Sequence, residues 1–218
     1  FKLNVREKTA RLHSWGFADV VTADKFSLGW GEIDDFLAQV VHESGYLEDM
    51  VENLNYRVER LQVVWPRRFT NLEYAKQFAN NPVALGNRVY GGRLGNNKEG
   101  DGFLYRGRSH LMITGKDNYE LVQAEIDEPV VDMPDLLATP RVALKASLAW
   151  WEKRIPDSMV GNAALVSRRV NGGDNGLKER IALATLVQKQ AVADVTMAHE
   201  KAINTENLDA AAQLASQK

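Results

Sequence analysis

The chain has 218 residues, of which 44% are hydrophobic and 26% charged, and its 27 basic and 29 acidic residues leave a formal net charge of −2. This balance excludes a disordered chain and argues against a general nucleic-acid binder, whose domain would be strongly basic. The lack of cysteine excludes disulfide scaffolds, thiol catalysis and thiolate metal sites, and no hydrophobic run approaches the roughly 20 residues of a membrane helix.

The spacing of hydrophobic residues predicts a mainly α fold. The clearest helix is expected over 31–42, where hydrophobic side chains recur every three or four positions, and Ser44 and Gly45 should end it. Poor helix propensity after Glu52 predicts a small irregular or two-stranded β piece near residues 50–60.

The rest of the chain, from residue 70 onward, is predicted to be mostly helical as well. Thr70 and Glu73 have the spacing of a capping box, and Thr139 before Pro140 is a typical helix start. Six glycines over 90–107 predict a long structured loop. The further helices are expected over 70–78, 83–89, 117–126, 140–154, 160–170 and 176–203.

Charge is unevenly distributed in the first third of the chain. Seven carboxylates and no cation occur over 31–52, whereas four arginines and one glutamate occur over 56–69. Two solvated faces of neighbouring elements would explain this pattern. A helical nucleic-acid module over 57–68 is the alternative, and it predicts binding that weakens steeply with salt.

Glu43 is the first candidate for chemistry, because it lies at the end of the predicted helix, one residue before a break. An exposed glutamate at a helix end is the alternative. A zinc protease is excluded, since Tyr46 stands where the second histidine would follow His42. No Gly-x-Ser-x-Gly pattern surrounds Ser44, which excludes a serine nucleophile elbow.

Glu52 is the candidate partner of Glu43. On one continuous helix, nine residues span about 13.5 Å, which exceeds the roughly 6.5–9.5 Å between the carboxyls of an inverting glycosidase. The break after Glu43 allows the two carboxylates to face each other, one protonated and one ionised. Glu48, Asp49 and Glu59 remain competitors for the second role.

Several motifs in order and spacing resemble glycoside hydrolase family 19, and more narrowly its bacteriophage endolysin branch, whose lysozyme-like enzymes cleave peptidoglycan. The resemblance covers about residues 33–187. It implies a lysozyme-like fold in one catalytic domain over 1–218, with a helical extension over 1–28, a core over 29–203 and a C-terminal segment over 204–218. The motifs are 38–45, 52–56, 87–96, 105–108 with 113–119, and 170–173 with 180–181.

The resemblance also implies roles for individual residues. Glu43 matches the general acid, Glu52 the second carboxylate that orients or deprotonates water, and Thr114 a hydroxyl that helps to hold that water. Family enzymes act by inversion without a metal or cofactor. The residues that resemble substrate-binding positions are Tyr56, Arg108, Asn118, Asn171 and Arg180.

Two positions depart from the family pattern, because Ser109 replaces a glycine and Met112 a glutamine. Met112 offers no amide to a sugar, which affects the preferred glycan more than the catalytic step. Arginines at 88, 93, 106 and 108 could meet the carboxylates of peptidoglycan or serve as structural anchors. Most of the five tryptophans should be core residues, with Trp65 as the candidate for sugar stacking.

The sequence therefore predicts a monomeric peptidoglycan hydrolase whose partners are glycan strands, with no nucleic acid and no membrane insertion. As an endolysin, it would be made in the host bacterial cytoplasm and act on the wall in the periplasm after release by a holin. A chitinase would use the same chemistry on another polymer. A non-catalytic glycan-binding protein on the same scaffold is the alternative from another class.

Overall fold

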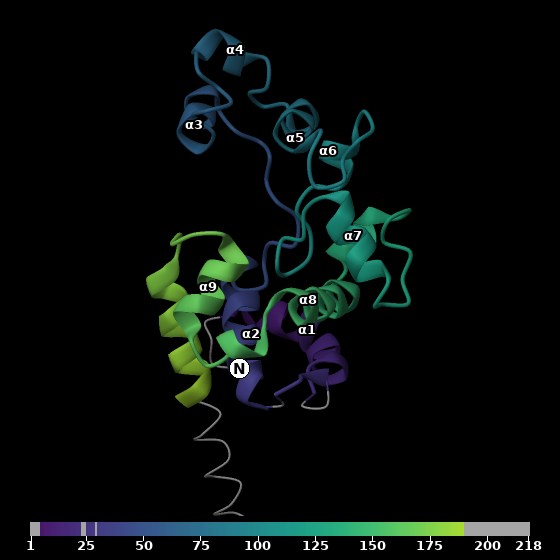
Figure 1. The fold of residues 1–218 in the computed structure, drawn as a ribbon, viewed down its shortest axis with the longest axis vertical. Helices are drawn as coiled ribbons and strands as arrows, with labels where there is room; N and C mark the ends of the chain where they lie inside the picture. The colour runs from purple at the N-terminus through teal and green to yellow at the C-terminus, as the bar shows by residue number, and fades with distance from the viewer. Residues whose placement is uncertain (1–4, 23–24, 29, 190–218) are drawn as a thin grey trace, which may run out of the picture.

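The computed structural model describes residues 5–22, 25–28 and 30–189 of the 218 (Figure 1). The C-terminal segment predicted from 204 onward, and the last part of the helix predicted over 176–203, lie outside the described residues. Among the described residues, no helix is both long and hydrophobic enough to cross a membrane.

The described part of the chain is mainly α, as the hydrophobic spacing predicts. Strand pairing there amounts to two isolated antiparallel bridges, from Arg108 to Val51 and to Ile113. The predicted β piece therefore involves residue 51 and the distant loop at 108–113. The helices are α1 Glu7–Val20, α2 Trp30–Glu43, α3 Val58–Val64, α4 Leu72–Lys76, α5 Pro82–Tyr90, α6 Asp101–Leu104, α7 Lys116–Gln123, the 3-10 helix η2 Pro134–Ala138, α8 Pro140–Arg154, the 3-10 helix η3 Asp157–Met159, α9 Ala163–Asn171, and a further helix over 177–189.

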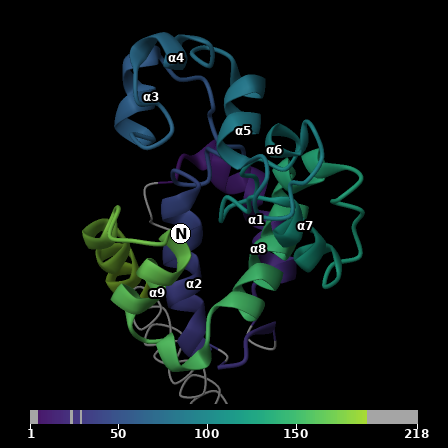
Figure 2. The same cartoon turned by 45° about the horizontal axis from the view of Figure 1, so that its top comes forward.

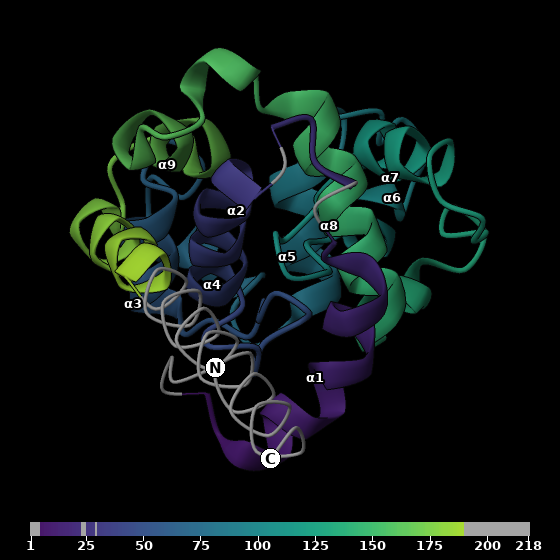
Figure 3. The same cartoon turned by 90° about the horizontal axis from the view of Figure 1, so that it is seen from below.

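The main core surrounds α2, whose residues Phe36, Ala38 and Val40 are fully buried. Figure 3 shows α2 between α9 and α8, and the core also takes buried side chains from the helix over 177–189. This packing explains why α2 shows such a clear hydrophobic stripe in the sequence. The helix that carries Glu43 is thereby fixed on several sides.

A second core belongs to the small lobe, which we define as residues 54–103. Figures 1 and 2 show α3 and α4 at the end of the molecule away from α8 and α9. Burial of Leu61, Phe69 and Leu85 holds α3, α4 and α5 together. The chain enters this lobe just after Glu52 and leaves it just before Gly107.

Several expected boundaries were wrong for identifiable reasons. Helix α4 is capped by Asn71, whose side chain accepts a hydrogen bond from the Tyr74 amide, so Thr70 is not the cap. Helix α7 begins at Lys116, directly after Gly115 at φ +91°, and so starts one residue earlier than the helix expected over 117–126. A helix over the region of α3 was predicted only in the alternative of a nucleic-acid module over 57–68. The sequence did not predict α6 inside the glycine-rich stretch, where a four-residue helix is too short to show a period.

Candidate active site

Glu43 is the last residue of α2, and local hydrogen bonds end the helix immediately after it. The Ser44 hydroxyl donates to the Val40 carbonyl at 2.6 Å and accepts from the Leu47 amide at 3.0 Å. Residues 45–47 then have φ values of +52°, +62° and +68°. Three successive left-handed residues cannot continue a helix, so a turn separates Glu43 from Glu52.

A buried arginine holds the Glu43 carboxylate. The Arg180 guanidinium donates to Glu43 Oε1 at 2.6 Å and to Gln39 Oε1 at 2.7 Å, and Arg180 is only 3% exposed. Gln39 in turn donates to the Ser167 hydroxyl of α9 at 3.1 Å. Arg180, which the family resemblance places among the substrate-binding positions, is therefore in direct contact with the candidate acid Glu43.

A glycine allows the segment before Arg180 to approach α2 closely. Gly176 has φ +66°, and a Cβ atom there would lie 2.4 Å from His42 Nε2. Any larger residue at 176 would collide with the imidazole and displace the turn that leads to Arg180. Burial is the main factor that lowers the pKa of His42, and the nearby Arg180 lowers it further.

Glu52 is held by neutral donors. The Tyr90 hydroxyl donates to Oε2 at 2.7 Å, and the Gly107 amide donates to Oε1 at 2.6 Å. The Glu52 amide also donates to the Gly107 carbonyl at 2.9 Å, which ties this residue to the chain leaving the small lobe. Burial raises the pKa of Tyr90, with the Glu52 charge as the second cause, so its hydroxyl stays a donor.

Thr114 and Glu52 both lie next to Gly107. A Cβ atom at Gly107 would be 3.2 Å from Thr114 Oγ1 and 3.3 Å from Glu52 Cδ, so glycine leaves the space between carboxylate and hydroxyl open. The Thr114 hydroxyl donates to the Met112 carbonyl at 2.9 Å. Asn118 donates to the Thr114 carbonyl at 2.8 Å and accepts from Arg154 at 3.0 Å, which places Asn118 behind the hydroxyl.

The structure separates the competitors for the second carboxylate. Glu48 accepts hydrogen bonds from Arg6 and Thr9 of the N-terminal region, so its carboxylate is used in packing α1. Glu59 lies on α3, within the small lobe. Asp49 is exposed in the turn region. Of Glu48, Asp49, Glu52 and Glu59, only Glu52 accepts a hydrogen bond from Gly107, the glycine packed next to the Thr114 hydroxyl.

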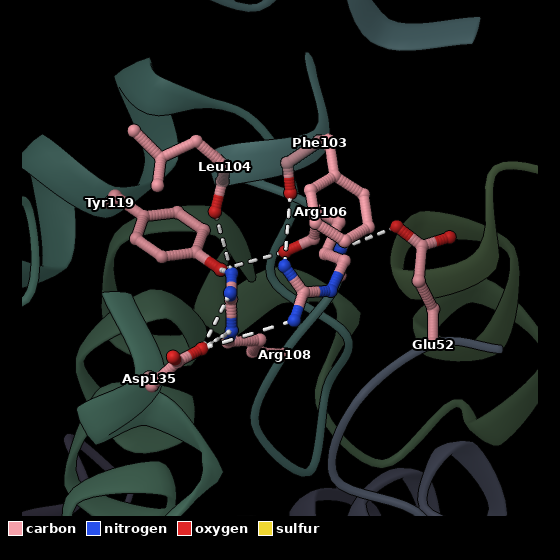
Figure 4. Close-up of polar contacts among 8 residues, drawn as sticks. Glu52, Phe103, Leu104, Arg106, Arg108, Tyr119 and Asp135 are labelled. Carbon is pink, nitrogen blue, oxygen red and sulfur yellow. Dashed lines mark hydrogen bonds and ion pairs between the residues drawn. The ribbon is translucent and has the colours of Figure 1, made fainter. Parts of the chain in front are cut away.

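Arg108 is a structural anchor, which is the alternative to the predicted substrate contact. It is 1% exposed, and its guanidinium donates to Asp135 Oδ1 at 2.7 Å, to the Leu104 carbonyl at 2.7 Å and to the Tyr119 hydroxyl at 2.9 Å. Figure 4 shows Arg106 and Arg108 both directed toward Asp135, while Glu52 approaches from the other side. The prediction that Arg108 binds substrate is therefore corrected.

The remaining predicted binding residues lie in different surroundings. Tyr56 packs edge-on against Trp65 at 5.2 Å, and both are partly buried side chains that pack against the core of the small lobe. Asn171 ends α9, and its buried Nδ2 has no hydrogen-bond partner among the described residues. A buried amide donor without a partner is uncommon in folded proteins.

Backbone geometry explains one departure from the family pattern. Ser109 has φ +72°, a left-handed conformation in which glycine is the residue of lowest cost. Its hydroxyl accepts from the Leu111 amide at 3.3 Å, and its amide donates to the Met50 carbonyl at 3.0 Å. Serine is therefore tolerated because it gains local hydrogen bonds. Among the described residues, no group of three or more His, Asp or Glu side chains could hold a metal ion.

Sequence reasoning missed two contacts of this site. Tyr90 and Gln39 both lie within the motifs, but nothing in their spacing pairs Tyr90 with Glu52 or Gln39 with Arg180. The only sequence signal for a donor to Glu52 was the presence of Tyr90 directly after the predicted helix over 83–89.

Comparison with known proteins decides the family. No family model matches the chain. A Haemophilus influenzae protein named "Glycosyl hydrolase family 19 domain-containing protein" is 37% identical over 150 residues, which are 68% of this chain and 74% of that protein. The chain belongs to glycosyl hydrolase family 19. It is therefore a glycoside hydrolase, as the motifs imply.

Solved family 19 structures share the fold. A class IV chitinase from Zea mays superposes with a TM-score of 0.50 at 16% identity, covering 86% of this chain and 82% of that one. A chitinase C mutant superposes with a TM-score of 0.52 at 19% identity, covering 85% of this chain and 91% of that one. At these identities the likeness concerns the lysozyme-like fold and not the substrate.

Proposed function

We propose that this family 19 enzyme is a peptidoglycan hydrolase of the phage endolysin branch, with Glu43 as general acid and Glu52 as general base. The observation that carries the proposal is the different bonding of two carboxylates on either side of the turn after α2. Glu43 is paired with a buried cation, whereas Glu52 accepts from neutral donors beside the Thr114 hydroxyl. Distinct surroundings allow two carboxyls to take opposite acid–base roles.

The proposed reaction uses Glu43 as the acid and Glu52 as the base. A water held between Glu52 and Thr114 gives a proton to Glu52, and its oxygen bonds to the anomeric carbon of the sugar. The bond from that carbon to the leaving oxygen breaks, and Glu43 gives its proton to the leaving oxygen. The carboxylate that Glu43 becomes is the charged form that Arg180 is placed to bind. The product has inverted configuration, and no covalent intermediate forms.

Peptidoglycan is favoured over chitin by the motif over 52–56, which resembles the phage-type pattern, and by the arginines near Glu52. Arg93 acts electrostatically on Tyr90, the residue that donates to Glu52. Chitin carries no carboxylates for such residues to bind, whereas peptidoglycan does. The proposal includes action on the wall in the periplasm after release by a holin.

The test is digestion of purified sacculi and of colloidal chitin in heavy-oxygen water, followed by mass spectrometry of the products. We expect muropeptides that carry one heavy oxygen at the new reducing end, and a much slower reaction on chitin. Equal or faster cleavage of chitin would contradict the peptidoglycan assignment. Absence of cleavage of either polymer would contradict catalysis.

Glu43→Gln and Asp49→Asn form the matched pair for the acid. Loss of a general acid costs about 10²–10⁴ in rate, so Glu43→Gln should abolish most cleavage, whereas the exposed Asp49→Asn should retain it. The amide oxygen of the introduced glutamine can still accept from Arg180, so the free energy of unfolding of Glu43→Gln, measured by urea titration, should stay within about 1 kcal/mol of the wild type. Equal digestion by Glu43→Gln and the wild type would end the assignment.

A further inference from the structure

The small lobe carries a charge opposite to that of the rest of the chain. The segment 57–93, which contains α3, α4 and α5, has seven basic and two acidic side chains, a net charge of +5. The other 20 basic and 27 acidic residues give the remainder a net charge of −7. The basic segment lies at the end of the molecule away from α8 and α9 (Figures 1 and 2). The protein is therefore strongly polarised, although its total charge is close to zero.

The arginines of this segment differ from the others in their bonding. All nine arginines outside the segment, each within the described residues, donate at least one side-chain hydrogen bond to another residue of the protein. Inside the segment, Arg57, Arg60, Arg67 and Arg93 are exposed, and none of these four makes a side-chain hydrogen bond or ion pair to another described residue. The described arginines whose side chains have no hydrogen bond or ion pair to another described residue therefore all lie in the small lobe.

The unpaired arginines are placed to act together. Arg57 is the N-cap residue of α3, and Arg60 lies in the first turn of the same helix. An open hollow of about 440 Å³ lies next to them, lined by Arg57 and Lys76 together with Glu59 and Asn80. A surface of this kind raises the local concentration of an anionic polymer.

The basic surface continues toward the candidate active site. Arg68 donates to the Arg88 carbonyl at 3.4 Å, which connects the turn after α3 to α5. At the end of α5, Tyr90 donates to Glu52, and Arg93 is close enough to act on the Tyr90 hydroxyl. A polymer bound along these cations would reach Glu52 without leaving the protein.

We propose that the basic segment over 57–93 is an anchoring surface for the carboxylates of peptidoglycan, separate from the groups that surround the bond to be cut. The choice of polymer rests on the proposed function. Guanidinium groups bind carboxylates with paired hydrogen bonds, and the peptide stems and lactyl groups of the wall present carboxylates along its length. A general nucleic-acid partner is a poorer match, because the whole chain has a net charge of −2 instead of the strongly basic charge typical of such binders.

The experiment compares co-sedimentation with intact sacculi for the wild type and for the triple variant Arg57→Gln, Arg60→Gln and Arg67→Gln. The matched control neutralises three exposed lysines outside the segment, Lys8→Gln, Lys25→Gln and Lys178→Gln, with the same change in charge. Exposed ion contacts contribute modestly each, so the triple variant should bind about tenfold more weakly and depend less on salt. The control should bind like the wild type.

Further arms separate this proposal from the proposed function. Co-sedimentation measures binding and not cleavage. A protein that binds sacculi but cleaves nothing would therefore refute the proposed hydrolase activity and support the proposed anchoring surface. Sacculi whose carboxylates have been converted to amides should no longer retain the wild-type protein. Unchanged retention by the triple variant or by amidated sacculi would overturn the anchor. So would stronger binding to DNA or to phosphatidylglycerol vesicles at the same salt concentration.

Should the triple variant prove unstable by circular dichroism, Arg60→Gln and Arg67→Gln are tested singly. Each side chain is exposed and bonded to no other described residue, so the fold should be kept. Each single variant should bind two- to threefold more weakly than wild type. Retention of both single variants at the wild-type level would contradict the anchoring surface.

Discussion

At the scale of residues, the environment of Glu52 depends on one hydroxyl and one backbone amide. Tyr90 and Gly107 each donate to a different oxygen of the carboxylate. Two donors fix the plane of the carboxylate, so that its remaining lone pairs point in a defined direction. Because a base must be aligned with the water it deprotonates, orientation here is as important as charge.

Tyr90→Phe removes one of these donors with little change in shape. We expect the rate of wall digestion to fall about tenfold, as is typical for loss of a hydrogen bond to a charged group. The melting temperature should change little. Tyr74→Phe is the control, since Tyr74 lies in the same lobe and its hydroxyl has no hydrogen bond to a described residue. Similar rates for Tyr90→Phe and Tyr74→Phe would show that the donor to Glu52 does not matter.

At the scale of elements, α1 packs against both loops of the site. Arg6 and Thr9 bind Glu48 in the segment between the two candidate carboxylates, and His13 contacts His110 at 3.1 Å in the loop that leads to Thr114. His13 is 2% exposed and His110 is fully buried. Burial lowers the pKa of His110 to about 3, and the nearby His13 adds to this effect. Burial also lowers the pKa of His13, against the opposing effect of Glu48.

Acid should therefore weaken the packing of α1. A histidine in the unfolded chain binds a proton near pH 6.5, whereas folded His110 binds one only near pH 3. The unfolded state thus takes up protons first, and stability is complete above about pH 6.5 and is lost as the pH falls toward 3. His110 alone would cost about 1.4 kcal/mol per pH unit in this range.

His110→Gln tests this dependence, because glutamine has a similar size and does not titrate. Urea titrations at pH 7 and pH 5 should show a large difference in unfolding free energy for the wild type and a smaller one for the variant. We expect the difference in unfolding free energy that remains in the variant to come from His13. Identical differences for the two proteins would mean that His110 has no influence on acid stability.

The sequence predicted those elements whose physics is local. The stripe on α2, the break at Ser44 and Gly45, the start of α8 at Pro140 and the end of α9 before Gly172 all follow from nearby residues. The ion pair of Glu43 joins residues 137 positions apart, and no local pattern indicates it. Only resemblance to the family pointed to Arg180. Burial of Arg108 was likewise not predictable, since an arginine in a glycine-rich loop looks the same whether anchored or free.

At the scale of the whole molecule, the site lies where two separately packed lobes meet. Glu52 and Gly107 exchange backbone and side-chain hydrogen bonds at the two crossings of the chain between the lobes. Phe69 is fully buried in the small lobe against Trp65 and Phe78, whereas Phe36 is fully buried in the main core against Phe26 and Trp151. The stability of one lobe can therefore be altered by itself.

Phe69→Ala should remove about 3–5 kcal/mol of packing energy from the small lobe. In hydrogen-exchange mass spectrometry, amides of α3, α4 and α5 should lose protection while those of α2 and α8 keep it. The converse variant Phe36→Ala should affect α2 first. Uniform loss of protection across both lobes in Phe69→Ala would show that the two cores unfold as one unit.

The left-handed run at residues 45–47 makes the spacing of this turn as important as its composition. Tyr46 is 41% exposed and Leu47 is 6% exposed, so the two side chains point to different surroundings while the backbone completes its reversal. One inserted or deleted residue would rotate everything downstream and redirect Glu52. Anyone grafting this site onto another scaffold should therefore preserve the number of residues between the two acids, even where their identities are changed.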